Sequence, residues 1–213
     1  MPYNITSITL KLIIFLSIVE KLITLQREYE KNIMAAVKSL TENEVLKLKA
    51  TVLYILNKCG GDLDYFRIFK FLYFADREHY AKYGRRIIQD TFCAFNDGPV
   101  PSILYDAMKG NQGTYSTCSP YSAHYYIRRA MADPDLDELS KSDIEMLDKS
   151  IKENESLSYS ELSNKSHDNA WQEAWDAENN SAMNPLSMAM AGGASDAMMC
   201  YIREHEEINS LLN

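Results

Sequence analysis

Histidine and cysteine are the residue types in this chain that most often bind metal ions or act as nucleophiles. The histidines are far apart and form no HExxH or HxH pattern; they are His79, His124, His167 and His205. The cysteines are also single residues without CxxC spacing; they are Cys59, Cys93, Cys118 and Cys200. We therefore expect no metal site, histidines with surface or structural roles, and cysteines that are buried as small hydrophobic side chains.

Cysteine-dependent hydrolysis would need a thiol, a base and an oxyanion hole. Cys59 or Cys93 with His167 is the pairing to consider, but no local signature surrounds these residues. The Gly60-Gly61 and Gly192-Gly193 pairs lack the spacing of phosphate-binding loops and are typical of helix ends. We therefore predict no catalytic residue, no cofactor and no enzyme activity. An unrecognised hydrolase is the alternative from a different functional class.

The composition is that of a globular chain with an acidic C-terminal part. Of 213 residues, 46% are hydrophobic, and the formal net charge is -8. Residues 131–213 contain 18 acidic and 5 basic side chains, a balance of -13. Such a surface repels phosphate backbones, so direct nucleic-acid binding is disfavoured. The absence of a cleavable signal favours a reducing compartment, and we expect the protein in the cytoplasm.

The N-terminal segment Ile5–Leu25 is apolar, but its longest uninterrupted run is well below the ~20 residues of a membrane span. The charged residues that interrupt it are Lys11, Glu20 and Lys21. It also lacks the compact basic region and small-residue cleavage site of a secretory signal. Three interpretations remain open: an amphipathic helix for a partner or membrane surface, a helix that caps the core, or a natural start at Met34. We favour the last two.

Two long helices are predicted in the next part of the chain. Thr41 and Glu44 form a T-x-x-E capping box, after which apolar residues recur at helical spacing until the Gly60-Gly61 pair. The segment from Asp64 to Gly84 follows, with an acidic first residue, a wide aromatic and aliphatic face and a terminal glycine. Such an aromatic stripe is typical of a core helix rather than of a cofactor site.

A strand, a turn and a helix are predicted after the second long helix. RIIQDTFCAF (86–95) is rich in β-branched and aromatic residues before the Asp97-Gly98 turn, and HYYIRRAM (124–131) is a candidate partner strand. Between them, Pro101 suits the first turn of a helix that Gly110 ends.

The C-terminal part is predicted to be helical. Capping-box patterns begin at Ser142 and Ser158, and Pro185 interrupts the chain before a last helix from Ala194 to Leu212. The charged REHEE run within that helix is expected to face solvent.

The sequence as a whole predicts a predominantly helical α+β fold. We expect one compact multi-helix domain with a small antiparallel β-sheet over residues 34–213, preceded by an amphipathic helical extension over residues 1–33.

Three stretches, taken in order, resemble the Panacea domain of the SocA-like antitoxin family. They are FKFLYFADREHYAKYGR (69–85), GPVPSILYDAMKG (98–110) and ELSNKSHDNAWQEA (161–174). The resemblance implies a compact, mainly helical domain that neutralises a toxin by binding it, with the toxin commonly encoded by an adjacent gene. It implies neither catalysis nor a cofactor. A phage or mobile-element regulatory adaptor on the same fold is the alternative.

The resemblance also singles out residues within the three motifs. They are Tyr73, Asp76, Gly98, Pro99, Pro101, Tyr105, Asp106, His167 and Trp171. We expect most of them to be structural, because Gly98 can supply a turn position with positive φ and the prolines fix the path of the chain. Asp76, Asp106 and His167 are candidates for a polar network between helices or for part of a partner surface.

Overall fold

The computed structural model describes residues 40–108, 121–124, 127–177 and 181–212. In it, Leu40–Asn213 forms one compact unit. The predictions made for residues 1–33, Gly110, Cys118 and the side chain of His124 lie outside the described residues, and so does the predicted domain boundary.

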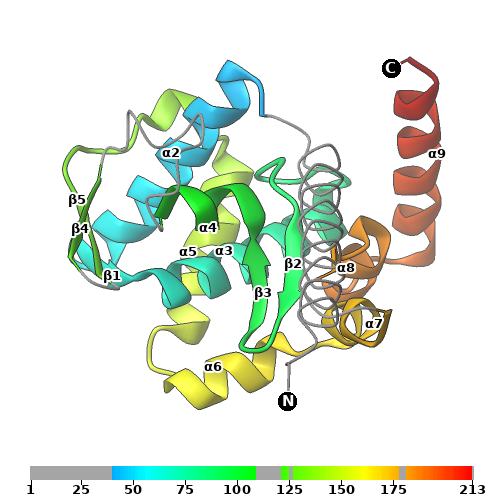
Figure 1. Ribbon diagram of the computed structural model, residues 1–213. Coiled ribbons are helices and arrows are strands. Elements are labelled where there is room, and N and C mark those ends of the chain that lie inside the picture. The colour runs from blue at the N-terminus through cyan, green and yellow to red at the C-terminus, as the bar shows by residue number, and fades with distance from the viewer. Residues whose placement is uncertain (1–39, 109–120, 125–126, 178–180, 213) are drawn as a thin grey trace, which may run out of the picture. The chain divides into compact units, whose positions relative to one another are not determined.

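Helix α3 (Tyr65–Tyr83) lies inside this unit, with other elements on several sides (Figure 1), and is buried along most of its length. It begins where the Asp64 carboxylate accepts a hydrogen bond from the Arg67 amide at 2.9 Å. It ends at Gly84, which has a φ of +67°. Both predicted ends of this helix are therefore confirmed.

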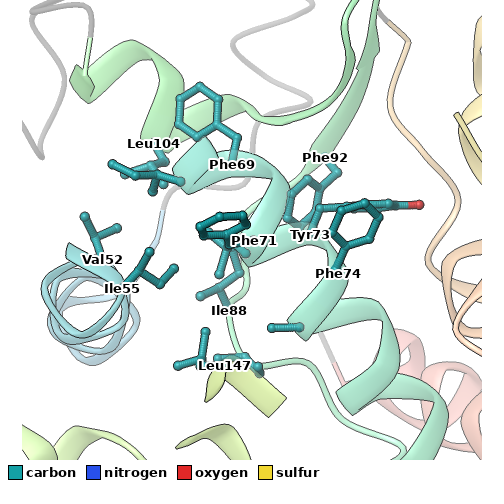
Figure 2. Close-up of a cluster of buried hydrophobic side chains, with 14 of the residues drawn as sticks. Val52, Ile55, Phe69, Phe71, Tyr73, Phe74, Ile88, Phe92, Leu104 and Leu147 are labelled. Atoms are coloured by element: carbon teal, nitrogen blue, oxygen red, sulfur yellow. The ribbon is translucent and has the colours of Figure 1, made fainter. Parts of the chain in front are cut away.

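The hydrophobic core forms between α3 and three neighbouring helices, α2 (Glu42–Lys58), α5 (Lys141–Asn154) and α8 (Pro185–Ala191). Figure 2 shows Phe71 of α3 in the middle of a cluster that includes Ile55 and Leu147. The ring of Tyr73 lies in the same cluster, and its hydroxyl points outward. The aromatic stripe of α3 is thus part of the core, as predicted.

The other helices are arranged around this core or extend from it. They are α4 (Ser102–Met108), the short 3-10 helix η2 (Leu136–Glu138), α6 (Tyr159–Ser166), α7 (Asn169–Ala177) and α9 (Asp196–Leu212). Helix α9 packs on α8 through one face, where Ile202 is buried, and runs along one side of the unit (Figure 1).

Two small antiparallel sheets complete the unit. The three-stranded sheet has the order β1-β5-β4, formed by Asp62–Asp64, Ile127–Ala130 and Tyr121–His124 respectively. The two-stranded sheet is a hairpin of β2 (Phe92–Phe95) and β3 (Gly98–Pro101). The fold is α+β and predominantly helical, as predicted, although the strands form two sheets rather than one.

The predicted pairing of residues 124–131 with residues 86–95 is wrong. Strand β5 pairs instead with β1 and β4. The predicted strand is also too long, because β2 begins only at Phe92. The preceding chain is held in a turn by the buried carboxylate of Asp76, which accepts hydrogen bonds from the Ile87 and Ile88 amides at 2.6 and 3.2 Å.

Two predicted helix starts also need correction. The box expected at Ser142 is wrong, since Ser140 caps α5 and its amide donates to the Asp143 carboxylate at 2.9 Å. Those at Thr41 and Ser158 are confirmed. Helix α4 begins after Pro101, which is the last residue of β3.

Candidate functional site

The β2–β3 hairpin turns through a two-residue loop, and Gly98 begins the returning strand. Gly98 has a φ of +100°, the positive value that the sequence predicts. A Cβ atom at this position would lie 2.8 Å from Lys70 Nζ and closer still to Ser166 Oγ. Because glycine lacks a Cβ, the hairpin backbone can lie directly against α3 and α6.

Lys70 lies beneath this turn, and its side chain is 0% exposed. Its Nζ donates a hydrogen bond to the Pro99 carbonyl at 2.9 Å and lies 5.0 Å from the centre of the Phe66 ring. No ion pair joins it to a carboxylate among the described residues. Burial therefore lowers the pKa of Lys70 from 10.5 to about 7, against an opposing effect of Asp97.

Helices α6 and α7 hold the other side of the hairpin. Trp171 Nε1 donates to the Phe95 carbonyl at 2.9 Å, and Ser163 Oγ donates to the Asp97 carbonyl at 3.2 Å. The His167 ring stacks on Trp171 at a centroid distance of 3.8 Å. Burial, and then the charge of Lys70, lower the pKa of His167. The hairpin is thus fixed between α3, α6 and α7.

A cavity of about 550 Å³ lies beside the hairpin. It is lined by Asp64, Tyr65, Phe66, Phe69, Lys70, Phe95, Asn96, Asp97, Val100, Tyr105 and Tyr159. The lining is mostly aromatic, with two carboxylates and one amine. An arrangement of this kind suits a ligand that has an apolar or flat body and one polar group.

Tyr159 joins two walls of this cavity. Its ring stacks on Phe66 of α3 at a centroid distance of 3.9 Å, and its hydroxyl donates to the Asp97 carboxylate of the hairpin. Burial and this hydrogen bond raise the pKa of Tyr159 to about 12. The side chain is nevertheless 52% exposed, so an approaching partner can reach it.

Comparison with known proteins covers most of the residues of this site. Residues 68–172 match the family model described as "Antitoxin SocA-like, Panacea domain". Over this range the chain is similar to a SocA-like Panacea domain. No curated protein and no solved structure matches the chain.

The structure brings several of the predicted motif residues of the Panacea domain together. Gly98 and Pro99 cover Lys70, Tyr105 lines the cavity, and His167 and Trp171 support the hairpin from α6 and α7. Pro101 is buried at the end of β3 and leads into α4. These predicted residues come from the second and third motifs and Lys70 belongs to the first, so the hairpin is the place where all three motifs meet.

Tyr73 takes part in a second group beside this one. Its hydroxyl donates to Asp168 Oδ2 at 2.7 Å, and Arg77 forms an ion pair with the same carboxylate. Asp168 also accepts a hydrogen bond from the Trp171 amide at 3.0 Å, at the start of α7. Tyr73 therefore helps to place Trp171, which in turn holds the hairpin.

The predicted network of Asp76, Asp106 and His167 is not formed. The Asp76 carboxylate is buried and binds Arg86 and the backbone that follows it, whereas His167 stacks on Trp171. Asp106 is exposed on α4. Asp76 and His167 contact different parts of the structure.

Sequence reasoning missed Lys70 and Asp90. Lys70 is flanked at helical spacing by aromatic residues, and that spacing is the signal that could have shown its burial. Asp90 is buried and caps α4 from outside the helix, accepting hydrogen bonds from the Ile103 and Leu104 amides at 3.0 and 2.9 Å. No local pattern signals a cap that lies so far away in sequence.

The histidines and cysteines are dispersed in the part of the chain that the structure describes. That part contains no group of three or more side chains suited to hold a metal ion. His79 is buried, with Nδ1 2.8 Å from the Arg85 carbonyl, while His205 is exposed. The thiols of Cys59 and Cys93 are half-buried, and burial raises the pKa of each to about 11. The prediction that the cysteines are buried is therefore wrong for the described ones, because Cys59 and Cys93 are only half-buried and Cys200 is exposed.

None of the helices in the described ranges has the length and hydrophobicity that a membrane span requires.

The close contact at Gly98 predicts a large effect of adding one methyl group. Gly98→Ala should lower the free energy of unfolding by about 3 kcal/mol, from backbone strain and from overlap with Lys70 and Ser166. Gly193→Ala is the matched control, since Gly193 has a φ of +92° and no atom within 4 Å of a Cβ. Gly193→Ala should lower the free energy of unfolding by only about 1 kcal/mol. Equal losses in urea unfolding of the two variants would show that the hairpin does not press on α3.

The burial of Lys70 predicts a specific pH dependence. The unfolded chain keeps this proton up to pH 10.5, but the folded chain releases it near pH 7, so Lys70 destabilises the fold most at pH 7 and below. Lys70→Met should raise the free energy of unfolding at pH 7 by about 1–4 kcal/mol. The difference in free energy of unfolding between Lys70→Met and the wild type should shrink by about 2 kcal/mol between pH 7 and pH 9.

Lys152→Met is the control for this experiment, because Lys152 is exposed on α5. Denaturant unfolding at several pH values measures both variants against the wild type. A Lys70→Met difference that stays constant from pH 7 to pH 9 would contradict a lowered lysine pKa.

Proposed function

We propose that this protein is an antitoxin that neutralises a protein toxin by binding it directly. The observation that carries the proposal is the Panacea match over residues 68–172, which contains the first two motifs and all but the last two residues of the third. The toxin is encoded by an adjacent gene, and both proteins act in the cytoplasm of a bacterium. The chain itself performs no catalytic step, and it binds no nucleic acid directly.

The cavity beside the hairpin is the surface that we assign to the toxin. Stable protein complexes depend on a few aromatic or arginine anchors at a pocket, whereas charges at the rim mainly change the association rate. Tyr159 supplies an exposed aromatic ring at the mouth of a cavity with aromatic walls. The acidic C-terminal part of the chain, with a balance of -13 over residues 131–213, would speed the approach of a basic toxin.

The raised thiol pKa values also support a binding role over the hydrolase alternative. A nucleophilic cysteine works as a thiolate, and a pKa of about 11 keeps Cys59 and Cys93 protonated at neutral pH.

Co-expression tests this function. The neighbouring gene product alone should arrest growth, and co-expression of the full chain should restore growth and give a complex that co-purifies. Raising the salt concentration should slow association, because charge steering is screened. Rescue without a detectable complex would refute direct neutralisation and favour the regulatory adaptor.

Two tyrosines of similar exposure locate the toxin-binding face. Tyr159→Ser should weaken the complex about tenfold or more, as expected for an aromatic anchor. Tyr201→Ser is the control on α9, because Tyr201 is 50% exposed and Tyr159 is 52% exposed. A complex weakened only by Tyr201→Ser would place the toxin on α9 instead.

A further inference from the structure

The charged side chains of the cavity lining that a ligand can reach are acidic. Asp97 is exposed at the hairpin loop, and Asp64 is half-buried at the start of α3. The only amine in the lining, Lys70, is 0% exposed and is covered by the Gly98 backbone and the Phe66 ring. Arg67 Nε lies 3.5 Å from Asp64 Oδ2 and offsets that charge, so Asp97 is the lining carboxylate that we consider for a cation.

The aromatic walls also favour a flat cation. Phe66 and Tyr159 are stacked at 3.9 Å, and Phe95 and Tyr105 form a second pair with a centroid distance of 5.4 Å. A guanidinium group stacks on aromatic faces and donates several hydrogen bonds in its plane, which carboxylates accept. The aromatic lining and Asp97 provide these two kinds of contact, whereas Asp64 is already bound by Arg67.

We propose that the cavity beside the β2–β3 hairpin binds an arginine side chain of the protein partner, with its guanidinium between the aromatic walls and paired with Asp97. This inference rests on the proposed function for the identity of the partner, but the ligand chemistry rests on the cavity alone. Charge complementarity supports it, since the chain has a net charge of -8 and attracts basic proteins.

Lys70 makes the affinity of this site depend on pH. Its amine faces Asp97 of the hairpin and His167 at the end of α6. The other titratable groups of the lining are Asp64, Tyr65, Tyr105 and Tyr159. A protonated Lys70 repels a guanidinium, and burial brings the pKa of this amine to about 7. Affinity for arginine should therefore rise as the pH increases from 6 to 8. A carboxylate ligand would show the opposite trend.

The test uses the full chain and three short peptides with blocked ends, Phe-Arg-Phe, Phe-citrulline-Phe and Phe-Glu-Phe. Citrulline has the shape of arginine without its charge, so this comparison needs no change to the protein. At pH 8, calorimetry should show that the arginine peptide binds about tenfold more tightly than the citrulline peptide, with the glutamate peptide weakest.

Protein variants then locate the binding. Asp97→Asn should weaken the arginine peptide about fivefold, whereas Glu204→Gln, at an exposed position of α9, should leave its affinity unchanged. Phe66→Leu should weaken binding of the arginine peptide, although an apolar side chain still lines the cavity. Lys70→Met should remove most of the increase in affinity between pH 6 and pH 8.

Equal affinity for the arginine and citrulline peptides, or preference for the glutamate peptide, would overturn the inference even if the antitoxin restores growth. Arginine preference that is unaffected by Asp97→Asn and Phe66→Leu would also overturn it. Arginine preference at this cavity without growth rescue would support the ligand chemistry and refute the antitoxin function instead.

Discussion

The burial of Lys70 beneath the Gly98-Pro99 turn is the constraint on which the site depends. A lysine amine inside a protein needs hydrogen-bond partners, and here the Pro99 carbonyl supplies one at 2.9 Å. That bond requires the hairpin backbone to lie against α3, which only a residue without a Cβ permits at position 98. Together with the hydrogen bonds from Trp171 and Ser163, this contact holds the hairpin against the central helix.

The remaining parts of the site follow from the position of the hairpin. Trp171 of α7 and Ser163 of α6 bind its carbonyls, and the hydroxyl of Tyr159, at the start of α6, binds the Asp97 carboxylate. The cavity is the space left between the hairpin, the start of α3 and the start of α6. The three Panacea motifs are far apart in sequence, and each forms a different side of the structure around the hairpin.

Much of the fold could be predicted because its signals are local. Asp64 and Gly84 set the ends of α3 through hydrogen bonds and dihedral angles within a few residues, and the same is true of the turn at Gly98. The errors arose where distant groups decide the structure. Asp76 bends the chain before β2 from ten or more positions away, and strand pairing depends on which edges meet in space.

The candidate site also combines features that local sequence predicts with features that depend on distant residues. The motif resemblance indicated Gly98, Pro99, His167 and Trp171, but the cavity depends on Lys70, which looks in the sequence like one charged residue in an apolar helix. Its role became visible only when the hairpin was seen to cover it. The aromatic residues at helical spacing around Lys70 indicate its burial, but the hairpin that covers it comes from a distant part of the chain, which a window of sequence does not show.

The most direct measurement is the titration of the lysine side chains by NMR, with ¹³C at the Cε position. The resonance that disappears in Lys70→Met should titrate with a midpoint near pH 7, far from the value of about 10.4 expected for exposed lysines. A midpoint near 10 for that resonance would show that Lys70 is solvated, and would contradict the account of the hairpin, the cavity and its pH dependence.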